Sequence, residues 1–137
     1  MADPTTFPDI IRGAVASIPE VSFYDGYVPE KLPQTGEYIN PYVVLWATLP
    51  DNPAEITSCG TQSMDTKVWD FQLTVVGASP DTCRRVAQET LGKVVNLQVG
   101  TGNVRRNPDA FQQAPVLDTT TSPSRFMLPL QLRLITN

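Results

Sequence analysis

The side chains that most often carry catalysis are sparse in this chain of 137 residues. The sequence has no histidine, which removes the commonest general base and any Ser–His or Cys–His nucleophile pair. Two cysteines, Cys59 and Cys83, are too few for a four-ligand zinc site. Cys83 falls on a predicted apolar helix stripe, and Cys59 has no nearby cation to lower its pKa. Because nothing signals secretion, we expect two reduced, unreactive thiols.

Carboxylates and glycines give no clearer site. Asp65 with Asp70, and Glu30 with Glu37, lie in or beside predicted loops, where solvated surface charge is the usual state. The stretch 100–103, Gly-Thr-Gly-Asn, lacks the Lys-Ser/Thr of a phosphate-binding loop and is typical of a tight turn. We therefore expect no cofactor, no metal site and no enzymatic activity.

Basic residues occur as two doublets, Arg84-Arg85 and Arg105-Arg106. A doublet in a loop is usually solvated, although it can also form ion pairs across an interface. The net charge of −4 argues against nucleic-acid binding as the main function, because affinity for phosphates comes from Lys and Arg. No apolar run approaches the roughly 18 residues of a membrane span, so we expect no membrane segment.

Two amphipathic helices are predicted, each with start signals. The first begins with Thr6 as a cap and Pro8 in the first turn, and ends at Pro19. The second begins with Ser79 as a cap and Pro80, and runs to about residue 95. The apolar stripe of the first helix comprises Ile10, Ile11, Ala14, Val15 and Ile18. The stripe of the second comprises Cys83, Val86, Ala87, Leu91, Val94 and Val95.

Three β runs complete the pattern. Residues 42–49 are apolar on both faces, which predicts a central strand. Residues 68–76 alternate between apolar and polar side chains, and 126–135 also alternate. Pro129 cannot donate a ladder hydrogen bond, so the last strand is predicted to be an edge or to be bulged there. Trp46 and Trp69 lie on strands and are interpreted as core or interface packing.

These elements predict a single α+β domain over residues 1–137. We expect one mixed, mostly antiparallel sheet with two main helices packed on it, and extended loops at 55–67 and 105–124. A short strand is placed near 115–117. An open sheet edge and long polar loops in one domain need a partner or protection against pairing.

The order of five segments resembles the tail terminator (tail completion) proteins of long-tailed bacteriophages. The segments are YDGYVP at 24–29, PYVVLW at 41–46, VWDFQLTVVG at 68–77, SPDTCRRVA at 79–87 and APVLD at 114–118. The resemblance covers residues 21–136 and rests on order and spacing, because no segment is a strong motif by itself.

The resemblance implies a virion protein that assembles in the host cytoplasm as a hexameric ring at the head-proximal end of the tail tube. One ring face would dock on the tail tube protein and stop polymerisation, and the other would meet the head-tail connector protein. DNA would pass through the lumen without specific binding. The alternatives are a head completion (stopper) protein of the neck and, from another class, a small ligand-binding module.

We expect the loops at 55–67 and 105–124 to reach the neighbouring subunit, because they are long and polar for a compact domain. The oligomer-interface residues predicted by this hypothesis are Cys59, Gln62, Met64, Lys67, Arg105, Arg106, Asp118 and Arg125.

Deleting residues 56–65 should leave a folded monomer, because the deletion removes an interface loop and spares the predicted strands. Sedimentation velocity would measure the assembly. Ring formation by the deletion variant at the concentration that the intact chain requires would show that this loop is not an interface element.

Overall fold

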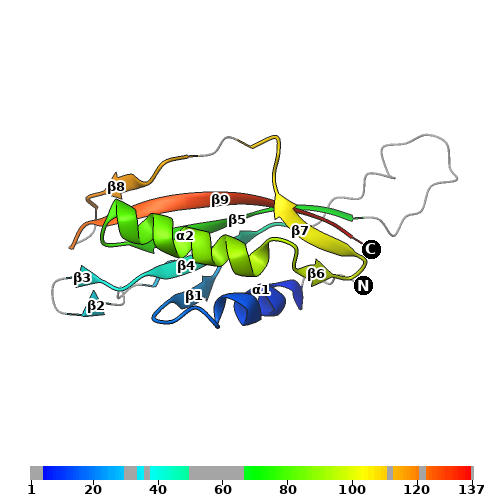
Figure 1. Cartoon of the computed structure of the whole chain (residues 1–137), viewed down its shortest axis with the longest axis horizontal. Coiled ribbons are helices and arrows are strands. Elements are labelled where there is room, and N and C mark those ends of the chain that lie inside the picture. Colours follow the sequence, from blue (N-terminus) through cyan, green and yellow to red (C-terminus); the bar gives the residue numbers. More distant parts are fainter. Residues whose placement is uncertain are drawn as a thin grey trace, which may run out of the picture.

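The computed structural model describes residues 5–29, 34–35, 38–49, 67–110, 113–120 and 123–136 (Figure 1). It contains two helices, α1 (Phe7–Val15) and α2 (Pro80–Val94). The strands are β1 (Ser22–Asp25), β2 (Gln34–Thr35), β3 (Tyr38–Ile39), β4 (Tyr42–Ala47), β5 (Lys67–Gly77), β6 (Gln98–Val99), β7 (Gly102–Arg106), β8 (Val116–Asp118) and β9 (Arg125–Thr136).

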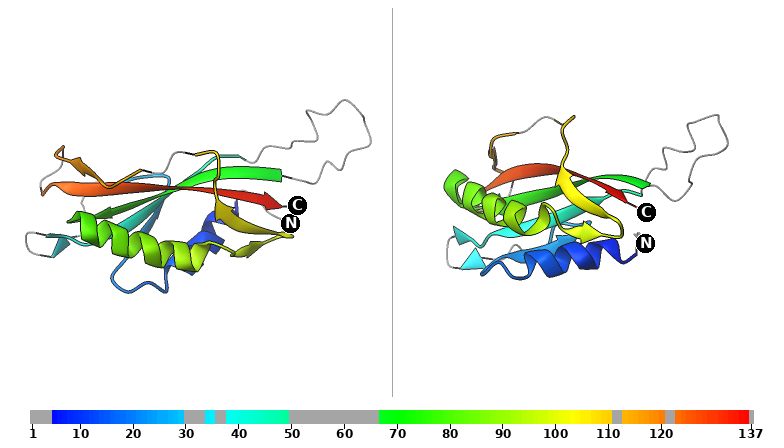
Figure 2. Two further views of the ribbon diagram at one scale, coloured as in Figure 1. Left: turned by 45° about the horizontal axis from the view of Figure 1, so that its top comes forward. Right: turned by 45° about the vertical axis from the view of Figure 1, so that its right-hand side comes forward.

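Seven of the strands form one curled sheet in the order β1-β4-β5-β9-β7-β6, with β8 paired to β9 off this path. The pair β1–β4 is parallel, and the other described pairs of this sheet are antiparallel. Strands β2 and β3 form a separate antiparallel pair. Both helices lie on one side of the large sheet (Figures 1 and 2). The predicted α+β class, with a mixed and mostly antiparallel sheet, is confirmed.

The core fills the space between the helices and one face of the sheet. Alternate residues of β5 and β9 supply much of it, because successive side chains in a strand point to opposite faces. The predicted inward face of β5 is confirmed, and its members Trp69, Phe71, Leu73 and Val75 are buried. Phe7 of α1 stacks on Trp69 with ring centroids 4.7 Å apart. Helix α1 is therefore docked on the sheet by an aromatic pair as well as by its aliphatic side chains.

The two helix starts differ from each other. Ser79 caps α2 as predicted, since its hydroxyl accepts from the Thr82 amide at 3.2 Å. The predicted Thr6 cap is wrong. Thr6 has helical backbone angles, φ −103° and ψ −20°, and its side chain makes no capping bond. A capping side chain reaches the first amides from an extended backbone, which Thr6 lacks.

The apolar stripe of α1 is narrower than predicted. The residues that the helix buries are Phe7, Ile11 and Val15, which are spaced by four. Ile10 lies beside this line and is 37% exposed, so its assignment to the buried stripe is wrong. Ile18 is buried, but it lies beyond the end of the helix.

The last strand is not an edge strand, because β9 lies between β5 and β7. Pro129 is tolerated there for a local reason. Strand β8 pairs with residues 125–127 of β9, and β7 pairs with 132–134, which leaves a gap between them. The Gln131 carbonyl points to this side, where it accepts from the Asn107 amide at 3.0 Å. Pro129, two residues earlier, has the same orientation, so its missing N–H faces the gap.

The stretch predicted as a loop at 105–124 contains parts of two strands, so the loop assignment of its first residues is wrong. Arg105 and Arg106 lie in β7, which pairs with β9 and is thereby held extended. Strand β8 falls one residue later than expected, at Val116–Asp118. The predicted tight turn at 100–103 is present as the link between β6 and β7, with Gly100 at φ +61°.

The turn between β6 and β7 is held against the end of β9. The buried Thr136 hydroxyl accepts from the amides of Thr101 and Gly102 at 3.1 and 3.2 Å. The same hydroxyl donates to the Val99 carbonyl. A Cβ atom on Gly102 would lie 1.8 Å from the Ile135 carbonyl oxygen. The hairpin can therefore approach β9 this closely only with glycine at that position.

Changing Gly102 to Ala should lower the free energy of unfolding by about 2 kcal/mol, because backbone atoms must separate to admit a methyl group. The matched control is Gly13→Ala in α1, where a Cβ meets no atom within 4 Å. There the change should raise stability by about 0.5 to 1 kcal/mol, since alanine favours the helix. Urea unfolding of both variants checks the pair, and effects of the same sign and size would contradict the close approach.

Candidate interaction surface

The face of the sheet turned away from the helices carries a hydrophobic groove of about 340 Å³. Strands β4, β5 and β9 line it with alternate residues, among them Val44, Val76 and Met127. Side chains that line it and stay partly open to solvent are Val28, 41% exposed, Trp46, 40%, and Val116, 53%. Apolar residues clustered around a hollow are typical of a binding surface.

Arg125, which lines the groove, belongs to an ion pair between β8 and β9. Asp118 and Arg125 are register partners, and the Arg125 Nε atom donates to the Asp118 carboxylate at 2.8 Å. The Arg125 Nη1 atom donates to the Tyr42 hydroxyl at 2.6 Å. Both charged side chains are only 12% exposed. This network ties the short strand β8 to β4 and β9 and so shapes the groove.

Hydrogen bonds hold Asp118 in its charged form. The hydroxyl and the amide of Thr120 both donate to its Oδ1 atom, at 2.6 and 2.9 Å. These bonds, followed by the bond from Arg125, lower the pKa of Asp118 to about 2. Burial raises the pKa of Tyr42.

A row of polar side chains crosses the same face at the other end of the strands. Arg133 donates through Nε and Nη2 to the two Asp70 oxygens at 2.7 and 3.2 Å, and through Nη1 to Asp109 at 3.0 Å. Hydrogen bonds to Asp70 and then to Asp109 raise the pKa of Arg133. Gln131 donates to Gln72 at 2.8 Å across the same two strands. The row fixes the side chains of β5 and β9 relative to each other.

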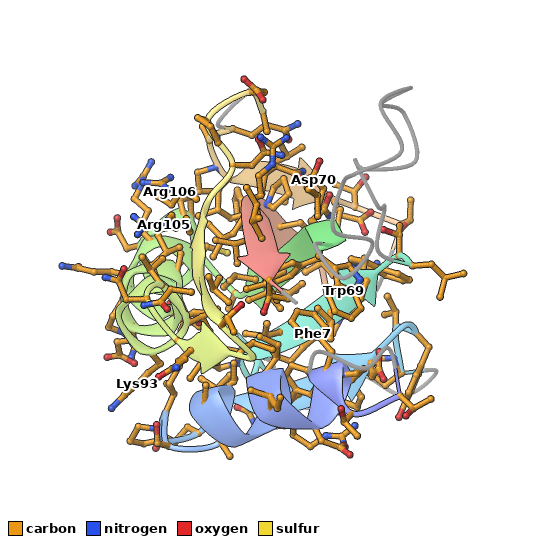
Figure 3. The ribbon with its side chains drawn as sticks, turned by 90° about the vertical axis from the view of Figure 1, so that its right-hand side faces the viewer. Phe7, Trp69, Asp70, Lys93, Arg105 and Arg106 are labelled. Carbon is orange, nitrogen blue, oxygen red and sulfur yellow. The ribbon has the colours of Figure 1, made fainter. Side chains whose placement is uncertain are left out.

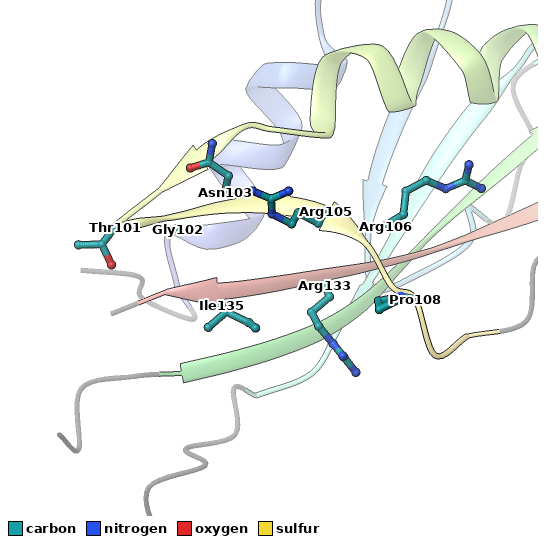
Figure 4. Close-up of a pocket in the computed structure, with 8 residues that line it drawn as sticks. All are labelled: Thr101, Gly102, Asn103, Arg105, Arg106, Pro108, Arg133 and Ile135. Atoms are coloured by element: carbon teal, nitrogen blue, oxygen red, sulfur yellow. The ribbon is translucent and has the colours of Figure 1, made fainter. Parts of the chain in front are cut away.

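Beside this row lies a second hollow, of about 720 Å³, at the side of the sheet formed by β7 (Figure 4). Three arginines line it, namely Arg105, Arg106 and Arg133, together with the β6–β7 turn. We call it the arginine basin. Figure 3 shows Arg105 and Arg106, with Lys93, on the side of the molecule where α2 lies.

The structure separates the predicted interface residues into groups. Cys59, Gln62 and Met64 lie outside the described residues, and Lys67 begins β5. The predicted interface members that line the arginine basin are Arg105 and Arg106, and the members that bind each other within the chain are Asp118 and Arg125. Strand β9 carries the groove end at residue 125 and the basin at residue 133, so the two sites are roughly 25 Å apart along the strand.

Sequence reasoning missed the groove itself. Its one signal in the sequence is the double-sided apolar character of β4, where Tyr42 and Val44 alternate with the core residues Val43 and Leu45. A strand that is apolar on both faces needs cover on both. In the described part of the chain, the second face is covered by a small cluster that includes Ile39 rather than by a helix.

Other described side chains that could take part in chemistry are buried or lie apart from one another. Cys83 lies in the core, and burial raises the pKa of its thiol to about 11. Over the described ranges, no three His, Cys, Asp or Glu residues are placed to hold a metal ion. No helix in the part of the chain that the structure describes has the length and apolar character to span a membrane.

Comparisons with known proteins find no protein-family model that matches the chain and no curated protein that matches it significantly.

Changing Asp118 to Asn should reduce the stability of the folded chain at neutral pH and weaken its acid dependence. A carboxyl group whose folded pKa is lowered stabilises the fold above its unfolded pKa, near 3.8, and this contribution is lost as pH falls towards 2. Urea unfolding from pH 7 to pH 2 measures both effects.

The control for this prediction is Asp81→Asn. The Asp81 side chain is 96% exposed and pairs with Arg84 one turn along α2. Such exposed pairs contribute little, so the control should follow the unmodified chain at each pH. Identical acid profiles for Asp118→Asn and the unmodified chain would show that the β8 ion pair does not stabilise the fold.

Proposed function

We propose that this chain is the subunit of a hexameric ring that caps the head-proximal end of a phage tail tube. The ring would stop tube polymerisation and join the tail to the head connector. In this proposal the protein assembles in the host cytoplasm, becomes part of the virion and lets DNA pass through its lumen without specific binding. Its activity is the geometry of its contacts, not a chemical reaction.

The observation that carries the proposal is the one-sided covering of the sheet. Helices α1 and α2 bury one face, while the other keeps a groove at which Val28, Trp46 and Val116 remain partly exposed. Exposed apolar side chains around a concave surface favour burial against another protein. A rigid sheet supports this surface, so it can dock without rearrangement.

A ring explains how such a subunit could end a polymer. Tube growth repeats one head-to-tail contact along an axis, whereas a cyclic ring closes a head-to-tail contact on itself. A ring that is complementary to the tube on one side adds once and offers no site for the next tube ring. The chain then needs surfaces for its neighbours and a different surface for the tube.

The groove also favours a second candidate, a small ligand-binding module. Its volume of about 340 Å³ is within the usual range for small-molecule pockets, and Arg125 and Tyr42 place polar atoms at one end. A ligand module would stay monomeric in light scattering and would show no affinity for tail tubes.

Adding the purified chain to growing tail tubes of the same phage should stop elongation and place a ring on one end, as seen by electron microscopy. Tubes of unchanged length and bare ends would contradict the proposal. Rings that bind purified heads and leave tubes uncapped would identify a head completion protein instead.

Changing Trp46 to Glu should abolish capping, because it puts a charge on the groove without disturbing the core. Ile10→Glu is the matched control, since Ile10 is 37% exposed, close to the 40% of Trp46, and lies on α1 on the other side of the sheet. Circular dichroism would confirm that both variants fold. Equal capping by the two variants would show that the groove does not contact the tube.

A further inference from the structure

Among the described residues, the arginine basin contains a positive charge that no ion pair compensates. Asp70, Arg133 and Arg105 are successive register partners on β5, β9 and β7, so the three side chains form one row across the sheet. Asp70 and Asp109 both bind Arg133. Arg105 has no ion-pair partner among the described residues, although it stands directly opposite another arginine.

Two like charges at opposite positions of an antiparallel pair destabilise the sheet, because their Cβ atoms are about 5 Å apart. Asp70 and Asp109 remove this problem for Arg133 but leave Arg105 unneutralised. The charge order along the row is negative, positive, positive. A carboxylate from outside the described chain would complete the alternation at the open end of the row.

The basin is a rigid site. The Thr136 hydroxyl holds the β6–β7 turn through the amides of Thr101 and Gly102, and Gly102 lets the hairpin sit against β9. Arg133 is fixed by three hydrogen bonds. A site whose walls are already ordered loses little conformational entropy when a ligand binds.

We infer that the arginine basin receives a carboxylate from a neighbouring copy of this chain, with Arg105 as its partner. The inference rests on the proposed ring, and it names one lateral contact of that ring. It is independent of the groove, which serves the tube in that proposal.

The distribution of charge along the sequence favours a second copy as the source. The first 65 residues contain nine Asp or Glu and two Lys or Arg, whereas the remaining residues contain five and eight. The chain therefore has an acidic first part and a basic second part, although its net charge is −4. Opposite charges on two parts of one chain favour a head-to-tail contact between copies.

Among the described residues, Glu20 and Asp25 are acidic side chains of this first part without an ion-pair partner. Glu20 precedes β1, and Asp25 is its last residue. Strand β1 lies at one edge of the sheet, and β7 and β6 lie at the other. A contact between the β1 edge of one copy and the β7 edge of the next would be heterologous, as a ring requires.

Nucleic acid fits the basin less well. Asp70 and Asp109, which bind Arg133 beside the basin, would repel a chain of phosphates. Arg105, which has no ion-pair partner among the described residues, can be matched by a single carboxylate. On α2 the cations Arg84 and Arg85 are each paired with an acid of the same helix. Strong binding to DNA depends on several free Lys and Arg residues acting together.

The test is charge reversal at Arg105, with self-association of the purified chain measured by sedimentation at low salt, about 50 mM, and at high salt, about 500 mM. Arg105→Glu should weaken association on the order of tenfold at low salt and flatten its salt dependence. Arg105→Lys should retain part of the affinity, because it keeps the charge but loses the guanidinium fork.

Arg84→Glu is the matched control, since it changes the net charge by the same amount on the exposed side of α2. It should associate as the unmodified chain does. The inference is overturned if Arg105→Glu and the unmodified chain associate equally, if the two reversals weaken association equally, or if the unmodified chain remains monomeric at low salt up to about millimolar concentration.

A parallel titration with a short DNA duplex separates the other class of partner. Salt-sensitive DNA binding that is lost in Arg105→Glu, without self-association, would overturn the inference in favour of a nucleic acid. Tube capping is assayed independently. If Arg105→Glu caps tubes and associates as the unmodified chain does, the lateral contact alone is refuted. If the unmodified chain associates but does not cap tubes, the proposed tube function alone is refuted.

Discussion

The pairing of β5 with β9 is the constraint on which the other features depend. The two strands stay in register along the whole of β5, from Lys67 opposite Thr136 to Gly77 opposite Phe126. This register sends one set of alternate side chains into the core and the other set to the uncovered face. A shift of β9 by one residue against β5 would turn Arg133 towards the core and Leu134 towards the uncovered face. The polar row and the core are therefore two results of one alignment.

Each functional feature is attached to this pair of strands at a different place. The Asp118–Arg125 ion pair binds β8 at the beginning of β9, and the Thr136 hydroxyl binds the β6–β7 turn at its end. The hydrophobic groove and the arginine basin are therefore held at a fixed distance by one continuous strand. The proposed ring subunit, which would meet its neighbour and the tube at separate surfaces, would need this kind of rigid spacing.

Features that depend on local pattern could be predicted from the sequence. The alternation of 68–76 identified the inward face of β5, and Ser79 with Pro80 identified the start of α2. Features that depend on which strands become neighbours could not. The sequence of β7, Gly-Asn-Val-Arg-Arg, has little intrinsic strand character, and it is extended because β9 provides a partner.

The candidate site was predictable to a similar degree. Arg105 and Arg106 were identified as a basic doublet, but their place opposite Arg133 and Leu132 of β9 depends on the hairpin that precedes them. Asp118 and Arg125 were expected to contact another subunit, and they contact each other because the hairpin between β8 and β9 makes them register partners. The groove required knowledge of which sheet face the helices leave open.

The gap along β9 between β8 and β7 has a further consequence for solubility. A backbone that displays free amides between two neighbouring strands invites a strand from another chain to add there and start aggregation. Pro129 lies in that gap and has no N–H to donate, so a strand that entered the gap would find the ladder interrupted at this residue. The longest described strand of the chain thus contains a local obstacle to unwanted strand pairing between copies.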